Sequence, residues 1–417
     1  MALAVGGSIG TVVTEALKEH YKPQRIKEMV YKNNPLLALI PKYTKFGGEN
    51  MPIPIITTGP QRRSATFLNA QTNTSTSSVQ QFLLTRVRDY SFASIEHEAI
   101  KASQSNADSF IRYATMEVDG AIHSLKRSLA VSLYRDGSGS IGQVSGEDAS
   151  GTDPAGSATT IYLTNADDIS NFEVGMKCDF YANSGGAPSG AARAGGSYTI
   201  SAVNRDADNP FITFSGNINS AVANTDHLVQ MGDLDAKLSG LEAWCPESAP
   251  GSGAFFGVNR TTDSTRLGGN RSDGSAKPIE EALIDGLSLA ARNGGTPSHV
   301  FCDYTSYANL EKALGSKVQY DKISASDANV GFTSLKLHGP SGTVDVVPDV
   351  NCQPNVAWAL QLDTWSLNSL GEAPQILDLD GNNMLRENAA DGYEVRIGFY
   401  GNCATVAPGF NTRIKLA

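Results

Sequence analysis

The stretch SNADSFIRYATMEVDGAIHSLKRSLAVSLY, residues 105–134, has the longest uninterrupted helical period in the sequence. Six aliphatic residues in it recur at spacings of three, four or seven, which places them along one side of a helix. They are Ile111, Val118, Ile122, Leu125, Leu129 and Leu133. Ser105 and Asp108 have the spacing of a capping box, and Gly137 follows as a stop signal. At about 1.5 Å per residue, the pattern predicts a helix roughly 44 Å long.

Two extended segments precede this helix, within residues 51–100. The first, residues 51–56, alternates aliphatic residues with two prolines, a pattern that suits an edge strand. The second, residues 80–100, is rich in aromatic and aliphatic residues with partial alternation. The polar sequence QTNTSTSS, residues 71–78, separates them, so we predict a projecting β-hairpin with a polar tip. An isolated two-stranded hairpin is only marginally stable in water, so this one needs a partner surface.

Residues 1–50 are predicted to form an arm rather than a domain. The first 45 residues hold seven Lys/Arg against three Glu, so this end of the chain is basic. The apolar sequence NPLLALIP, residues 34–41, is too short to bury itself and must pack on something else, in the same chain or in a neighbour. Leu36 and Leu37 are therefore candidate intersubunit contacts.

The predicted hairpin carries a second set of candidate contacts. Arg62 and Arg63 either form a solvated pair of little energetic consequence or contact carboxylates of a neighbouring subunit. The planar guanidinium group suits the second role because it can bind a carboxylate through two hydrogen bonds. We name both arginines, together with Phe67, as candidate intersubunit contacts.

The pattern changes twice after the long helix. Residues 141–240 are glycine-rich with several short β patterns separated by turns, which predicts an inserted small antiparallel barrel or sandwich. This part is acidic, because residues 141–250 hold four Lys/Arg against fourteen Asp/Glu. Residues 278–375 alternate between helical and strand patterns, and residues 376–417 are mostly β. The predicted fold class is α+β.

Several classes of function are disfavoured by composition and motifs. The net charge of −10 is unlike that of a duplex-DNA reader, which is usually basic. The five cysteines are widely spaced and form no C-x-x-C, which argues against a zinc site or a disulfide framework. The N-terminus lacks a basic region typical of a signal peptide, and no apolar run reaches membrane-spanning length. We expect no enzyme activity, no cofactor and no metal.

Two motifs resemble catalytic signatures without their required context. Gly137, Gly139 and Gly142 have the spacing of a dinucleotide fingerprint, but that motif follows a strand and opens a helix. Here a helix precedes the glycines and an acidic segment follows them. The sequence EHE, residues 96–98, has no second histidine at ligand spacing.

The order of these parts resembles that of tailed-bacteriophage major capsid proteins with a β-rich insertion. Local sequences resemble the family as well: NPLLALIP in the arm, and GVNRTTD at residues 257–263 followed by RLGG. The predicted parts are an N-terminal arm (1–50), an extended loop (51–100), a spine helix (101–140), the insertion (141–240), a peripheral-domain connection (241–277), an axial domain (278–375) and return strands of the peripheral domain (376–417).

The resemblance implies a protein that self-assembles, as pentamers and hexamers, into the icosahedral head around a double-stranded DNA genome. Scaffolding and portal proteins are the implied partners, with a decoration protein as a further candidate partner, and assembly is expected in the host cytoplasm. Weak contact with packaged DNA is expected from Arg112, Lys126 and Arg127, and the insertion is expected to face outward. Because the chain begins at Met1, we expect no cleaved leader.

Some members of the family cross-link their subunits through a lysine on the extended loop. This chain has no lysine between Lys45 and Lys101, so we predict no cross-linking. Three other identities were weighed: an extracellular β-rich adhesin or surface protein, a phage-derived nanocompartment shell, and a hydrolase. The missing signal peptide disfavours the first, the insertion disfavours the second, and the absence of a catalytic motif disfavours the third.

Overall fold

The computed structural model describes most of the chain beyond its first 33 residues. The described residues are 34–96, 107–145, 159–193, 196–206, 210–218, 222–315, 320–324, 331–378, 384–387 and 391–417. Their side chains are described except at residues 107–114, 320–324 and 331–333. The predicted capping residue Ser105, most of the basic arm and the acidic residues 146–158 lie outside the described residues.

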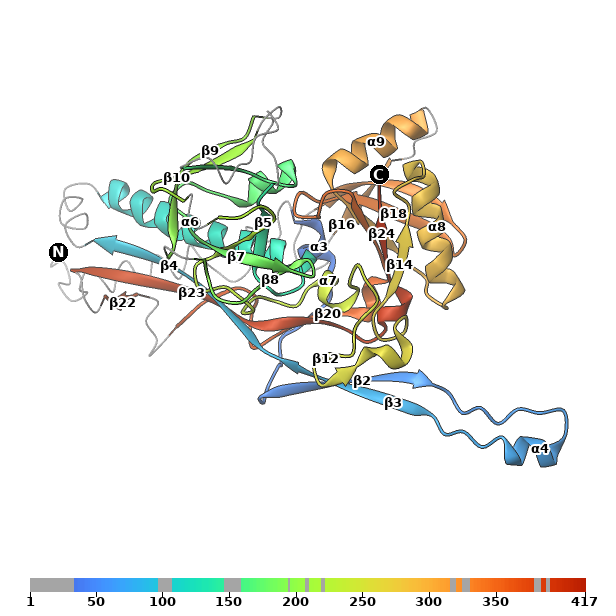
Figure 1. Ribbon diagram of the computed structural model, residues 1–417. Coiled ribbons are helices and arrows are strands. Elements are labelled where there is room, and N and C mark those ends of the chain that lie inside the picture. The colour runs from blue at the N-terminus through green and yellow to red at the C-terminus, as the bar shows by residue number, and fades with distance from the viewer. Residues whose placement is uncertain are drawn as a thin grey trace, which may run out of the picture.

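The predicted long helix is confirmed as α6 (Ala107–Tyr134), which lies along a six-stranded sheet (Figure 1). In that sheet β4 (Val87–Glu96) pairs antiparallel with β23 (Gly392–Thr405) along the whole length of β4. The sheet also contains β1 (Lys42–Tyr43), β20 (Trp365–Ser369), β21 (Gln375–Ile376) and β22 (Leu385–Arg386). The predicted stripe packs on the sheet: Val118, Ile122, Leu125, Leu129 and Leu133 are at most 2% exposed.

The predicted hairpin is formed by β2 (Asn50–Thr58) and β3 (Ser78–Thr85), and it projects from the body (Figure 1). Its tip differs from the prediction of a polar turn at residues 71–78. The loop covers residues 59–77 and contains a short helix, α4 (Phe67–Thr72). The reason is a cap: the Asn69 backbone N–H donates a hydrogen bond to the Thr66 hydroxyl oxygen at 3.4 Å.

The inserted segment folds as a small closed barrel with its own core. Its strand order is β5-β11-β7-β9-β10-β6, and a β-bridge between Val144 and Leu163 joins the first and last strands. Phe172, Phe180 and Ile212 fill its interior at 0–1% exposure. Its elements are β5 (Ser140–Gln143), β6 (Thr160–Tyr162), η3 (Ala166–Asn171), β7 (Lys177–Ser184), β8 (Ala187–Ser189), β9 (Tyr198–Asn204), β10 (Phe211–Phe214) and β11 (His227–Gln230). We call this unit the insertion barrel.

The remaining unit is a seven-stranded mixed sheet with two helices, in the order β14-β24-β19-β15-β18-β17-β16. The helix α8 (Ile279–Arg292) packs closely on β24 at Gly286. The Ile414 side chain there occupies the space that a Cβ would fill, so a glycine is needed. The other elements are α9 (Tyr304–Leu314), β14 (Asn270–Asp273), β15 (His299–Cys302), β16 (Tyr320–Ser324), β17 (Gly331–Gly339), β18 (Gly342–Pro348), β19 (Val356–Leu360) and β24 (Thr412–Lys415).

Short elements connect these units. They are α3 (Pro35–Leu39), α7 (Leu241–Trp244), β12 (Ala254–Phe255), β13 (Val258–Asn259), η4 (Arg260–Asp263), η6 (Leu362–Thr364) and η7 (Pro408–Phe410). The largest buried core runs from the base of the hairpin along α6 to the strands of both larger sheets, whereas the insertion barrel keeps a separate core. The barrel is therefore attached to the body mainly through polar contacts and two connecting segments.

Candidate assembly surfaces

The base of the hairpin is fixed to its own subunit by aromatic packing. Phe82 of β3 is fully buried, and its ring centroid lies 5.2 Å from that of Trp244 and 6.2 Å from that of Phe255. The indole N–H of Trp244 donates to the carbonyl of Cys403 at 3.0 Å, which ties this cluster to β23. The hairpin therefore leaves the body in a fixed direction.

The tip of the hairpin is exposed, and none of the residues of α4 is buried. Phe67 is 79% exposed and Leu68 72% exposed, and the nearby Arg62 and Arg63 are also exposed. The Asn73 side chain donates to the carbonyl of Arg63 at 3.4 Å, which holds the two sides of the loop together. The structure thus brings three of the predicted contact residues, Arg62, Arg63 and Phe67, to one tip.

The prediction for Leu36 and Leu37 is wrong. Both lie in α3 and are only 1% and 2% exposed, because they pack into the core of their own chain. The Leu36 N–H donates to Asp349 at 3.4 Å, and the hydroxyl of Tyr134, at the end of α6, donates to the same oxygen at 2.8 Å. Burial raises the pKa of Asp349 in spite of these hydrogen bonds. Neither leucine is available to a neighbouring subunit.

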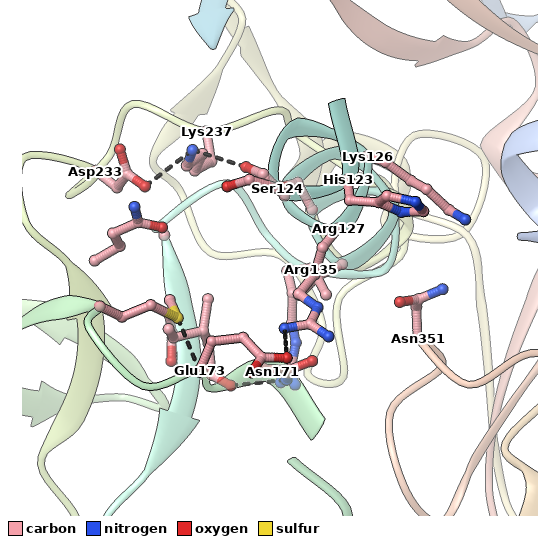
Figure 2. Close-up of a pocket in the computed structure, with 18 of the residues that line it drawn as sticks. His123, Ser124, Lys126, Arg127, Arg135, Asn171, Glu173, Asp233, Lys237 and Asn351 are labelled. Carbon is pink, nitrogen blue, oxygen red and sulfur yellow. Dashed lines mark hydrogen bonds and ion pairs between the residues drawn. The ribbon is translucent and has the colours of Figure 1, made fainter. Parts of the chain in front are cut away.

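A cleft of ≈ 550 Å³ separates α6 from the insertion barrel, and ion pairs bridge it (Figure 2). Arg127 of α6 lies 2.7 Å from Glu173, which also lies 3.1 Å from Arg205 of the barrel. Burial alone would raise the pKa of Glu173, but the two arginines outweigh it and hold that pKa below its ordinary value. These residues are half-exposed, so the bridge contributes little to stability.

A more buried bridge closes the other side of the cleft. The ammonium of Lys237 lies 3.0 Å from the carboxylate of Asp89 on β4 and 2.9 Å from that of Asp233. Burial lowers the pKa of Lys237, but the two carboxylates more than offset this and the pKa is raised. Lys237 therefore stays charged and links the connecting segment of the barrel to the main sheet.

These contacts bear on the residues predicted to face packaged DNA. Arg127 is paired with the insertion barrel, and Lys126 lines the same cleft. The side chain of Arg112 lies outside the described residues. Lys126 and Arg127 thus lie on the same side of the sheet as the insertion. The sequence predicted an inward-facing Arg127 and an outward-facing insertion, and this arrangement does not allow both.

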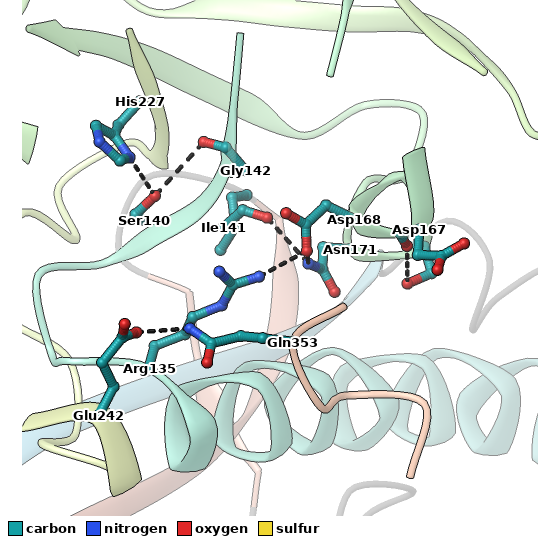
Figure 3. A network of polar contacts seen from close by, with 11 residues as sticks. Arg135, Ser140, Ile141, Gly142, Asp167, Asp168, Asn171, His227, Glu242 and Gln353 are labelled. Atoms are coloured by element: carbon teal, nitrogen blue, oxygen red, sulfur yellow. Dashed lines mark hydrogen bonds and ion pairs between the residues drawn. The ribbon is translucent and has the colours of Figure 1, made fainter. Parts of the chain in front are cut away.

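A polar network fixes the insertion barrel where it meets the end of α6 (Figure 3). Arg135 lies 2.6 Å from Asp168 of η3, and Asn171 donates to the carbonyl of Ile141 at 2.9 Å. Burial lowers the pKa of Arg135, but the carboxylates of Asp168, Glu242 and Asp136 together outweigh this effect and the pKa is raised. Because the Asp168 side chain is buried, loss of Arg135 leaves an unpaired charge in the protein interior.

The sequence analysis missed the exposed aromatic residues of β4. Tyr90 is 55% exposed and Phe92 66% exposed, although they alternate with residues that face α6. The strand pattern could have revealed them. With Tyr90 and Phe92 on one face and the residues that face α6 on the other, β4 carries apolar side chains on both faces. The ion pairs of Glu173 with Arg127 and of Lys237 with Asp89 had no such signal, because the two residues of each pair are distant in sequence.

The described residues offer little for catalysis or metal binding. All five cysteines are buried and unpaired, and burial raises the pKa of Cys178 and that of Cys245 to about 12. Among the described residues, no group of three His, Cys, Asp or Glu side chains is arranged to hold a metal ion. None of the described helices is long and apolar enough to cross a membrane.

Residues 202–386 match the sequence model of a family described as the SU10 major capsid protein. The match begins in β9 of the insertion barrel and ends at β22 of the six-stranded sheet. It confirms the predicted resemblance to phage major capsid proteins and supports a capsid-forming, structural function over the alternatives. No curated protein sequence matches the chain.

Several solved structures are similar to the chain. The cyanophage A-1(L) capsid protein is 12% identical, covers 92% of each chain and has a TM-score of 0.45. The capsid protein of Myoviridae phage XM1 is 10% identical over 92% of each chain, with a TM-score of 0.42. The SrpI encapsulin from Synechococcus elongatus PCC 7942 is 8% identical over 99% of this chain and 96% of that chain, with a TM-score of 0.43.

Proposed function

We propose that this chain, which matches the major capsid protein family over residues 202–386, builds an icosahedral phage head by interlocking its subunits. The observation that carries the mechanism is the hairpin: its base is buried in its own subunit, whereas Phe67 and Leu68 at its tip are exposed. Exposed apolar groups on a rigid projection gain free energy when a neighbouring subunit covers them. Repetition of this contact gives closed rings, expected as pentamers and hexamers.

The contacts between subunits are non-covalent in this proposal, because no lysine lies on the hairpin. Arg62 and Arg63 add charge at the tip and would meet carboxylates of the neighbour. Their contribution is to orientation and rate of encounter more than to affinity, as is usual for charges at the rim of an interface. No enzyme activity, cofactor or metal enters the mechanism.

The proposed partners are a scaffolding protein and a portal protein during assembly in the host cytoplasm, then packaged double-stranded DNA in the virion. A decoration protein would bind the outer surface. The insertion faces outward in this proposal, because residues 141–250 hold fourteen acidic side chains against four basic ones and would repel DNA. Arg127 and Lys126 then lie outside with the insertion, so DNA contact at these two positions is disfavoured.

The experiment that tests the role of the hairpin is the double charge reversal Arg62→Glu and Arg63→Glu. Both residues are exposed, so the unassembled subunit should unfold at the same denaturant concentration as the unmodified protein. The fraction of protein that sediments as particles should fall. Equal yields of particles from both proteins would remove the two arginines from the assembly contact.

A further inference from the structure

The body of the subunit supports the projecting hairpin only along its base. Ile53, Ile55 and Thr57 alternate along β2 on the side that is covered, and they are only 4–5% exposed. Residues 58–77 form the end of β2, the loop and α4, and none of them is buried. Support by the body therefore ends at Thr57.

A β-bulge lies at the same place. Ile56 pairs with Val79 and Thr58 pairs with Ser78, so Thr57 is an extra residue of β2 without a register partner in β3. The extra residue of a bulge lies outside the ladder of backbone hydrogen bonds and bends its strand. The Thr57 hydroxyl donates to the carbonyl of Ser78 at 3.0 Å, which ties the two strands together here. The hairpin therefore has a bend point where its support ends.

A side chain of the body reaches this bulge. The guanidinium group of Arg266 donates a hydrogen bond to the carbonyl oxygen of Thr57. Asp263 orients the arginine, because its carboxylate accepts from the Arg266 backbone N–H at 2.9 Å and lies 3.6 Å from the guanidinium Nε. The backbone here is fixed as well, since Leu267 is fully buried and a Cβ on Gly409 would lie 3.0 Å from the Arg266 Cα. Arg266 is therefore anchored in the body and holds the bulge.

The other contacts that hold the hairpin lie closer to its base. The Leu83 backbone N–H donates to the carbonyl of Phe256 at 3.0 Å, and Phe82 packs on Trp244. In Figure 1 the yellow segment that contains β12 lies beside this part of the hairpin, and α4 lies well beyond it. Among the hydrogen bonds of the described residues that join hairpin and body, the bond from Arg266 is the one nearest the tip.

A small rotation at the bulge would displace the tip by several ångströms. The chain from Thr57 to Phe67, the first residue of α4, spans up to about 33 Å when extended at about 3.3 Å per residue. A rotation of about 10° at the bulge would then move Phe67 by up to about 6 Å. Apolar contacts need heavy atoms within about 4.5 Å of each other, so this shift is large enough to break the contact of the Phe67 ring with a neighbour.

We propose that Arg266 is a positioning residue, which fixes the direction of the hairpin beyond the Thr57 bulge and thereby the place where the tip meets a neighbouring subunit. This inference rests on the proposed function and adds the residue that aims the hairpin. Arg266 acts through Thr57 and does not itself have to touch the neighbour. A tip held in one direction loses less conformational freedom on binding, which favours association. The competing role is that of an exposed ion pair with Asp263, which would contribute little.

Spin labels on the free subunit test this role without assembly. The native cysteines are all buried, so labels attach to cysteines introduced by Leu68→Cys at the tip and Ile284→Cys on α8, where the native residues are 72% and 39% exposed. Electron paramagnetic resonance then measures the distribution of distances between the two labels. Arg266→Met should at least double the width of this distribution, and Arg266→Lys, which keeps a donor, should narrow it again. The matched control is Arg386→Met, which removes an exposed arginine of β22, far from the hairpin, and should leave the width unchanged (Figure 1).

Assembly of the same variants tests the consequence for the shell. The Arg266 side chain is 58% exposed, so Arg266→Met should unfold at the same denaturant concentration as the unmodified protein. The protein concentration needed to form particles should rise about tenfold, and Arg266→Lys should recover part of this loss. An unchanged distance distribution in Arg266→Met, or a broader one with unchanged assembly, would overturn the positioning role. Failure of the unmodified protein to form particles would instead overturn the proposed function, and the distances in the free subunit separate the two results.

Discussion

Two phenylalanines lie on the same hairpin, and their replacement by alanine should have opposite effects: one should lower the stability of the subunit and the other should weaken assembly. Phe82 is fully buried against Trp244, so Phe82→Ala removes a core side chain and should lower the free energy of unfolding by about 3–5 kcal/mol. Phe67 is 79% exposed, so Phe67→Ala should change the stability of the free subunit by less than about 0.5 kcal/mol.

Assembly should reverse this order of effects. If a neighbour buries the Phe67 ring, its loss costs about 1.5–3 kcal/mol per contact, which is roughly a 10- to 150-fold weaker association. Denaturant unfolding of the unassembled subunit measures the first effect, and light scattering against protein concentration measures the second. The reasoning fails if Phe67→Ala unfolds like Phe82→Ala, or if Phe67→Ala assembles at the same concentration as the unmodified protein.

Three further predictions concern the spine helix and the insertion barrel. Arg135→Met leaves the buried Asp168 unpaired and should lower the free energy of unfolding by about 3–5 kcal/mol in denaturant titrations; a loss below 1 kcal/mol would contradict the buried pair. Gly120→Ala should stabilise the free subunit by up to about 1 kcal/mol, because no described atom apart from those of its chain neighbours and of the backbone of its own helix lies within 4 Å of the added Cβ, and a lower melting temperature would refute this. Burial lowers the pKa of His227 below its ordinary 6.5, so the stability it contributes is present above pH 6.5 and is lost as pH falls through the lowered pKa. His227→Gln should therefore flatten the fall in melting temperature below pH 6.5, and an unchanged slope would exclude His227 as the cause.

The parts of the fold that local pattern determines were predictable from the sequence. The helical period of residues 105–134 was long enough to define α6, and its aliphatic stripe correctly predicted the face that packs on the sheet. The short strands and turns of the insertion predicted a barrel or sandwich, because several short β patterns follow one another with turn residues between them. These features depend on neighbours within a few residues.

The errors arose where the outcome depends on residues far apart in the chain. Leu36 and Leu37 were recognised as unable to bury themselves, but the partner that covers this segment, Asp349 with its loop, is more than 300 residues away. The sequence analysis placed Arg127 and the insertion on opposite sides of the shell, because the partner of Arg127, Glu173, lies 46 residues on and could not be read from the sequence. The exposed aromatic residues of β4 were missed because the buried face of the strand, with Ala93 and Ile95, is apolar as well.

The central claim is that copies of this chain interlock into a closed shell. The most direct measurement is negative-stain electron microscopy of the purified protein, alone and with a scaffolding protein. The account predicts polyhedral shells, or rings of five and six subunits, in at least one of these samples. Monomers alone in both samples, at concentrations where the subunit is folded, would contradict it.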